Sequence, residues 1–190
     1  MKTTIVWKRF ASFALFLSLT WMLCLQPIDT GQAQDKTDDA ASASPRAENS
    51  LDLRGDLPNP QRIGTIELRK LPRVELRTPD SHDPAKEIVY SGTPLVEVLK
   101  AGGLRLDAGE TGIRETVKMT VLVEAADGYQ AAFSLAELDP EFTDRVTLLA
   151  DTKDGQPLSS REGPFRIIVP NEKRPTRWVR QVKAVTVRKD

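Results

Sequence analysis

Basic side chains gather near the C-terminus in a loop that could bind an anion. Lys173, Arg174 and Arg177 lie close together in the sequence, and Trp178 follows them directly. Arginine offers a planar fork of N–H donors that suits phosphate, and lysine offers a compact positive charge. A solvated loop has the same composition, so the residue types alone leave both interpretations open. We expect Arg177 to be exposed and to contribute little to the stability of the ligand-free fold.

Tyr129 and His82 are the other side chains whose chemistry needs an interpretation. Tyr129 follows Asp127-Gly128, a predicted hairpin turn, and its ring either flanks that turn or stacks on a ligand. His82 is the single histidine of the chain. A zinc site or a hydrolytic triad needs more ligands, or an activated serine, than the sequence offers around it. We therefore interpret His82 as a solvated loop residue.

An apolar run positions the basic loop. Phe165–Val169 is rich in β-branched residues and lies between two prolines, which cannot donate to a sheet ladder, so it is predicted to be a buried strand. After Trp178 the apolar positions shift from Val182 to Val185 and Val187. A turn or bulge must therefore reset the register before a last strand.

Short strands and a few short helices are predicted for the rest of the domain. The apolar alternation predicts strands at Leu51–Leu57, Val74–Arg77, Ile88–Tyr90, Val117–Val123, Tyr129–Phe133 and Val146–Ala150. Thr65 is expected to cap a helix that reaches Leu71, and Thr93 to cap a helix whose first residue is Pro94. Ser134 and Glu137 have the spacing of a capping box. The predicted fold class is α+β, with a mixed and largely antiparallel sheet.

Charge is balanced over the whole chain but not along it. The 190 residues include 27 basic and 27 acidic side chains. Residues 161–190 hold 9 basic and 3 acidic side chains, whereas residues 49–160 hold 13 basic and 19 acidic ones. The C-terminal segment is thus an electropositive pole, which either pairs with the rest of the fold or attracts a ligand. Nucleic acid is not expected as a partner, because the chain as a whole is neutral.

The N-terminal residues have the pattern of a signal peptide. Basic residues precede an uncharged apolar run, Phe10–Leu25, and Gly31-Gln32-Ala33 supplies small residues for cleavage before Gln34. An uncleaved anchor is the alternative, but the run is shorter than the roughly 20 residues that span a bilayer. We predict a signal peptide over 1–33, a disordered linker over 34–50 and one domain over 51–190, exported to the periplasm or secreted, with no stable membrane anchor after cleavage.

Cysteine usage limits the chemistry of the exported protein. Cys24 is the only cysteine and lies inside the predicted signal peptide. The mature protein therefore has no disulfide, no cysteine nucleophile and no thiolate metal ligand.

Four segments carry a family resemblance in their order and spacing. They are Tyr90–Gly103, Ala126–Leu138, Leu148–Pro170 and Arg177–Val187. Together they resemble the molybdopterin-binding domain of the sulfite oxidase family of oxidoreductases. The resemblance implies an α+β fold that holds a pterin, whose dithiolene sulfurs bind molybdenum together with a cysteine of the protein. It also implies that Arg177 contacts the phosphate of the pterin.

The sequence departs from the family at the metal ligand. The family's cysteine lies shortly before the segment that matches Tyr90–Leu95, and the corresponding stretch here, Leu76–Val89, contains none. Without that thiolate the metal loses a strong donor, so we expect no stoichiometric molybdenum and no ordinary molybdenum catalysis.

Two interpretations of function therefore stay open. In one, the protein binds molybdopterin or another anionic small molecule. The cofactor-binding residues predicted for it are Lys173, Arg174, Arg177 and Tyr129. In the other, the domain is a non-enzymatic scaffold that binds a periplasmic protein partner. Fold resemblance cannot choose between them, because one fold serves many functions.

The signal pattern yields a direct prediction. Protein isolated from its own cells is expected to be soluble outside the cytoplasm and to begin at Gln34, since a signal peptidase reads the small residues before that position. N-terminal sequencing checks this expectation, and an intact Met1 in the membrane fraction would contradict it.

Overall fold

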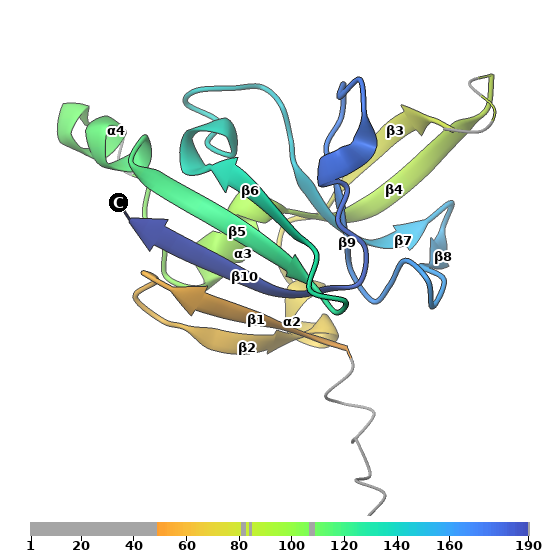
Figure 1. Ribbon diagram of the computed structural model, residues 1–190, viewed down its shortest axis with the longest axis horizontal. Coiled ribbons are helices and arrows are strands. Elements are labelled where there is room, and N and C mark those ends of the chain that lie inside the picture. The colour runs from red at the N-terminus through yellow and green to blue at the C-terminus, as the bar shows by residue number, and fades with distance from the viewer. Residues whose placement is uncertain (1–48, 81–82, 84, 107–108, 190) are drawn as a thin grey trace, which may run out of the picture. The chain divides into compact units, whose positions relative to one another are not determined.

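Two β-sheets form the framework of the fold (Figure 1). The computed structural model describes residues 49–80, 83, 85–106 and 109–189. The first sheet has the order β2-β1-β10-β5-β6 and contains β1 (Ser50–Gly55), β2 (Gln61–Gly64), β5 (Met119–Ala125), β6 (Gln130–Ser134) and β10 (Val182–Lys189). The second has the order β3-β4-β7-β8, with β9 also paired to β7, and contains β3 (Val74–Pro79), β4 (Glu87–Pro94), β7 (Leu148–Lys153), β8 (Gln156–Pro157) and β9 (Arg166–Ile168).

The pairing of the strands confirms the predicted fold class. In the described part of the chain β1 and β10 run parallel, and every other neighbouring pair is antiparallel. The helical elements are short: α2 (Thr65–Leu68), α3 (Leu95–Ala101), α4 (Glu110–Thr116) and the 3₁₀ turns η1 (Leu135–Glu137) and η2 (Pro175–Arg177). None of the described helices is long and apolar enough to cross a membrane. The fold is α+β, with a mixed and largely antiparallel sheet structure.

Where β7 pairs with β9, the second sheet is buried on both faces, which explains why these segments are continuously apolar. Leu149 and Ile167 belong to the large core cluster, while their neighbours Leu148 and Ile168 belong to a second, smaller cluster. Successive side chains of a strand point to opposite faces, so both faces must be covered by apolar groups. Trp178 is partly buried and packs against both clusters, and thereby ties the smaller cluster to the larger one.

Several local predictions are confirmed. Asp127-Gly128 forms the turn between β5 and β6, with Gly128 at φ +86°. Ser134 and Glu137 form the capping box at the start of η1. The register of the last strand is reset by Gln181, at φ +50°, and by a bulge between Val182 and Ala184.

The two predicted threonine caps are wrong. The N-cap of α2 is Gly64, and the Thr65 hydroxyl instead donates to the carbonyl oxygen of Asn49 at 2.9 Å. β4 continues through Thr93 to Pro94, because both residues still pair with β7, so α3 begins one residue later than predicted. In both cases a contact with a distant part of the chain replaces the predicted cap. The Thr65 hydroxyl is bound by Asn49, and the backbone of Thr93 pairs with β7.

The strand predicted to begin at Val117 begins at Met119 instead. Val117 is exposed and forms the C-cap of α4, a helix that the sequence did not indicate. Apolar periodicity is weak in α4, which carries an i,i+4 ion pair of 2.5 Å between Arg114 and Glu110. β3 also extends beyond its predicted end at Arg77, since Thr78 pairs with Ile88.

Candidate ligand-binding site

A pocket of about 1430 Å³ opens beside the second sheet. Its walls come from the end of β3, the β5–β6 turn, the segment leading into β9, and the loop from Pro170 to Gln181 that carries η2. The loop and the β3–β4 hairpin can be followed in Figure 1. The stretch Leu76–Val89, where the family resemblance places the metal-binding cysteine, contributes Arg77, Thr78 and Asp80 to the wall. His82 lies outside the described residues.

The lining of the pocket is basic on balance. It contains six basic side chains, Arg77, Lys153, Arg161, Arg166, Lys173 and Arg180, and four acidic ones, Asp80, Asp127, Glu162 and Glu172. A surface with this excess of positive charge raises the local concentration of anions.

Arg166 contacts two aromatic rings and two hydrogen-bond acceptors in the lining of the pocket. Its guanidinium group is 5.7 Å from the ring centroid of Tyr90 and 5.6 Å from that of Trp178. Its Nη1 donates to the Tyr90 hydroxyl at 3.3 Å and also to Glu162. Lys153 lies 5.8 Å from the Tyr90 centroid. Two cations therefore lie close to the ring of Tyr90.

Tyr90 remains a neutral hydrogen-bonding group in this cluster. Burial raises the pKa of its phenol above the ordinary value, although the positive charges of Arg166 and Lys153 oppose the shift. At neutral pH the hydroxyl therefore accepts the bond from Arg166 and keeps its own proton.

Three polar atoms of this pocket's residues are buried without a hydrogen-bond partner. They are the Thr78 hydroxyl oxygen, Nε of Arg166 and Oε2 of Glu172. Only four such side-chain atoms occur in the part of the chain that the structure describes, so three of the four belong to one pocket. Buried polar groups in folded proteins are normally satisfied, because an unmade bond costs about 1 to 3 kcal/mol.

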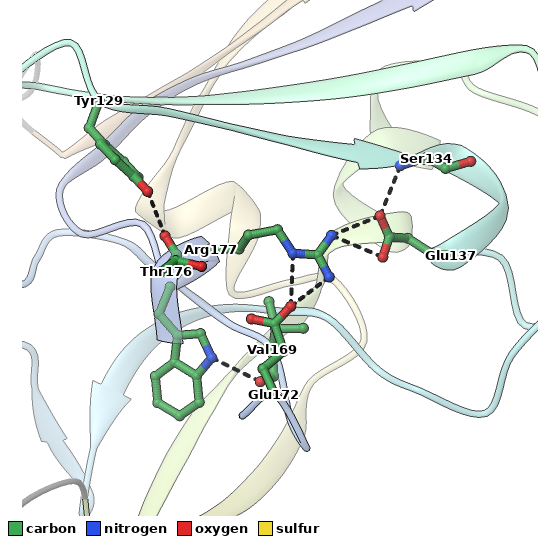
Figure 2. Close-up of polar contacts among 8 residues, drawn as sticks. Tyr129, Ser134, Glu137, Val169, Glu172, Thr176 and Arg177 are labelled. Atoms are coloured by element: carbon green, nitrogen blue, oxygen red, sulfur yellow. Dashed lines mark hydrogen bonds and ion pairs between the residues drawn. The ribbon is translucent and has the colours of Figure 1, made fainter. Parts of the chain in front are cut away.

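Arg177 is held between two carboxylates beside this pocket (Figure 2). Nε and Nη2 donate to Oε1 of Glu172 at 2.8 and 2.6 Å, and Nη1 donates to the two oxygens of Glu137 at 2.9 and 3.0 Å. The guanidinium carbon lies 4.7 Å from the ring centroid of Phe133. Burial by itself would lower the pKa of Arg177, but the hydrogen bonds to Glu172 and Glu137 outweigh it and raise the pKa. Arg177 is thus partly buried and ion-paired, which corrects the expectation of an exposed loop residue.

The predicted site residues are only partly brought together. Lys173 and Tyr129 line the pocket, and the Tyr129 hydroxyl donates to the carbonyl oxygen of Thr176 at 2.7 Å. Arg174 and Arg177 are not among the described residues that line it. A role for these four residues in binding a cofactor stays a prediction.

The residues that sequence reasoning missed lie on other elements. Arg166 is the one charged residue inside the apolar run Phe165–Val169, and a charge kept in a buried strand is a signal that could have identified it. Lys153 and Thr78 carried no such signal, because only the sheet pairing brings β3 and β7 to the same pocket.

The comparison with known families places the chain. Residues 41–190 match the family model of the oxidoreductase molybdopterin binding domain. This match spans well over half of the chain, so the chain belongs to that family, as the sequence resemblance predicts. No curated protein matches the sequence.

A solved structure supports the fold. The chain is similar to the sulfane dehydrogenase SoxCD from Paracoccus pantotrophus, with a TM-score of 0.58 and 16% sequence identity. The similarity covers 76% of this chain and 39% of the other, so the chain spans about two fifths of the length of that relative. At this identity the likeness establishes the fold alone.

The lining of the pocket suits the organic part of a molybdopterin. Its basic side chains and aromatic rings match an anionic, planar molecule. Residues 25–190 contain no cysteine, and in the described part of the chain no group of three His, Cys, Asp or Glu could hold a metal ion. The protein thiolate that the family uses as a metal ligand therefore has no counterpart in the domain.

The Arg177 ion pairs predict a loss of stability on mutation. Arg177→Ala leaves two partly buried carboxylates without their shared cation, so we expect the free energy of unfolding to fall by about 1 to 3 kcal/mol. Urea denaturation measures the change, with Arg105→Ala, an exposed residue outside the pocket, as the matched control. Equal stabilities of the two variants would show that the ion pairs contribute nothing.

Proposed function

We propose that the domain binds a pterin or another anionic small molecule in this pocket, in an exported protein, without ordinary molybdenum catalysis. The observation that carries the proposal is the lining of one pocket, in which six basic side chains stand against four acidic ones and aromatic rings lie beside them. Membership of a molybdopterin-binding family supports the pterin as ligand class. The signal-type N-terminal segment supports export.

Each group on the wall has a task in such binding. Arg166 contributes a guanidinium group to the lining, and Lys153 adds a second positive charge without a fixed hydrogen-bond geometry. The neutral phenol of Tyr90 supplies a further donor. The rings of Trp178 and Tyr129 offer aromatic surface to a planar ligand.

This chain differs from its family in the protein ligand that would complete the metal site. A bound molybdopterin supplies dithiolene sulfurs that can hold a metal. The domain's own residues add no thiolate to those sulfurs, because none of residues 25–190 is a cysteine. A metal held without that donor has a different geometry and redox potential, so the proposed role is binding rather than oxidation.

Anion binding is expected to raise the thermal stability of the protein. A ligand at 100 times its dissociation constant adds about 2.7 kcal/mol, which corresponds to a rise of about 8 °C in melting temperature. We expect this rise with pyrophosphate or a pterin phosphate at fixed ionic strength. Arg166→Lys should weaken the binding about tenfold, because lysine cannot reproduce the planar fork of N–H donors of the guanidinium group.

The control for this experiment is Arg105→Lys, which changes an exposed arginine outside the pocket. A thermal-shift titration of the three proteins provides the measurement. If no anion raises the melting temperature beyond the effect of salt, the pocket is a solvated surface, and the partner-binding scaffold becomes the better account.

Because the domain has no thiolate ligand, we predict that the purified protein contains little molybdenum. Protein purified from its own cells is expected to hold far less than one molybdenum atom per chain and to leave sulfite unoxidised with an artificial electron acceptor. Elemental analysis and a sulfite assay check both. Near-equimolar molybdenum would show that the thiolate is dispensable and would overturn the non-catalytic role.

A further inference from the structure

We propose that a basic surface beside the pocket binds an acidic segment of another protein. This surface, the basic rim, consists of Arg161, Lys173, Arg174 and Arg180, whose side chains are all exposed. Three of them line the pocket, and Arg174 follows Lys173 directly in the sequence. The inference goes beyond the proposed function, because this partner is a protein and contacts exposed cations around the pocket.

Ion pairing divides the cations of the C-terminal segment into two groups. Residues 161–190 hold 9 basic side chains. Those that form ion pairs are Arg166, Arg177, Lys183 and Lys189. Those that form no ion pair with a residue described by the structure are Arg161, Lys173, Arg174, Arg180 and Arg188. All of this second group except Arg188 belong to the basic rim. The charge that the fold leaves uncompensated in this segment is therefore concentrated beside the pocket.

The backbone holds two of these arginines close together. Gln181, at φ +50°, follows Arg180. Its backbone N–H donates to the carbonyl oxygen of Glu162 at 2.9 Å, and its side-chain amide donates to that of Ser160 at 2.8 Å. These two bonds lie on either side of Arg161 in the sequence, so Arg161 and Arg180 extend from neighbouring, fixed backbone positions. Order that exists before binding lowers the entropy cost of association.

Tyr129 adds an exposed aromatic ring to the same surroundings. It is 49% exposed and lines the pocket. Its hydroxyl donates to the carbonyl oxygen of Thr176, in the loop that carries Lys173 and Arg180 (Figure 2). Tyrosine and arginine are enriched among the residues that dominate the binding energy of protein interfaces. The composition of this surface is thus typical of a protein-binding site.

The charge pattern favours an acidic protein segment over a nucleic acid or a membrane. Exposed cations without partners attract carboxylates and steer a charged protein toward the surface. Asp127 and Glu172 line the same pocket, and a continuous polyanion laid across it would be repelled by both. A polypeptide mixes acidic residues with neutral ones, so its carboxylates can meet the cations and leave these two acidic positions uncontacted.

An acidic peptide and its neutral counterpart test the inference. The probes are fluorescein-labelled Glu-Asp-Glu-Trp-Glu-Asp-Glu and the same peptide with Gln for every Glu and Asn for every Asp. Fluorescence anisotropy measures their binding to the full mature protein. We expect the acidic peptide to bind at least about tenfold more tightly than the neutral one, and its affinity to fall as the salt concentration rises.

The decisive variant is Arg161→Gln/Arg180→Gln, which removes the two arginines that the backbone holds together. Its affinity for the acidic peptide is expected to be about tenfold lower than that of the wild type. Arg105→Gln/Arg145→Gln is the matched control, because it removes the same charge from exposed arginines outside this pocket. The control should change the affinity less than about threefold. Melting temperatures confirm that both variants are folded.

Each outcome decides the inference. It is wrong if the wild-type protein binds the two peptides equally, or if both double variants lose affinity to the same extent. Tighter binding of a single-stranded oligothymidylate or of phosphatidylglycerol vesicles than of the acidic peptide would also overturn it, since the rim would then prefer other polyanions.

Pyrophosphate separates this test from that of the proposed function. If pyrophosphate raises the melting temperature of the wild-type protein but the acidic peptide does not bind, the proposed function stands and the inference fails. Binding of the acidic peptide without any effect of pyrophosphate would support the inference and count against the small-molecule site.

Discussion

The position of Trp178 is the constraint on which the candidate site depends. The smaller apolar cluster has five buried members in the described part of the chain, Ile88, Tyr90, Leu148, Ala150 and Ile168. The indole packs against both clusters, and its N–H donates to the carbonyl oxygen of Val169 at 2.8 Å. It meets the Tyr90 ring edge-on, with 6.1 Å between centroids. The loop before Trp178 is therefore anchored at the place where it forms a wall of the pocket.

The charged residues near this loop are not all available to a ligand. Arg177, next to the anchored indole, is neutralised by Glu172 and Glu137 and does not present a free cation. Arg166 and Lys153 add positive charge from the second sheet, and both face Glu162. The family fold is retained while the thiolate for the metal is absent from residues 25–190. The proposed function, binding of a small anionic molecule without molybdenum catalysis, rests on these two observations together.

The sequence predicted the local parts of this arrangement better than the long-range ones. The β5–β6 turn, the capping box at Ser134 and the shift of register before β10 follow from short patterns, and all three are present. α4 escaped prediction because its apolar periodicity is weak. The cluster of Arg166, Lys153 and Thr78 escaped because three strands distant in sequence must meet before these residues share a pocket. The partners of Arg177 were missed for the same reason, since Glu137 lies forty residues away.

The side-chain N–H of Arg166 offers the most direct measurement of the account. In a ¹⁵N-labelled sample its Nε–H resonance can be assigned by comparison with Arg166→Lys and followed by NMR during titration with pterin phosphate at fixed ionic strength. The account predicts a saturable shift of this resonance, because an anion binds beside the guanidinium group, with no comparable shift for Arg105. An Arg166 resonance that stays in place, or that moves only as it does with sodium chloride, would contradict the existence of the site.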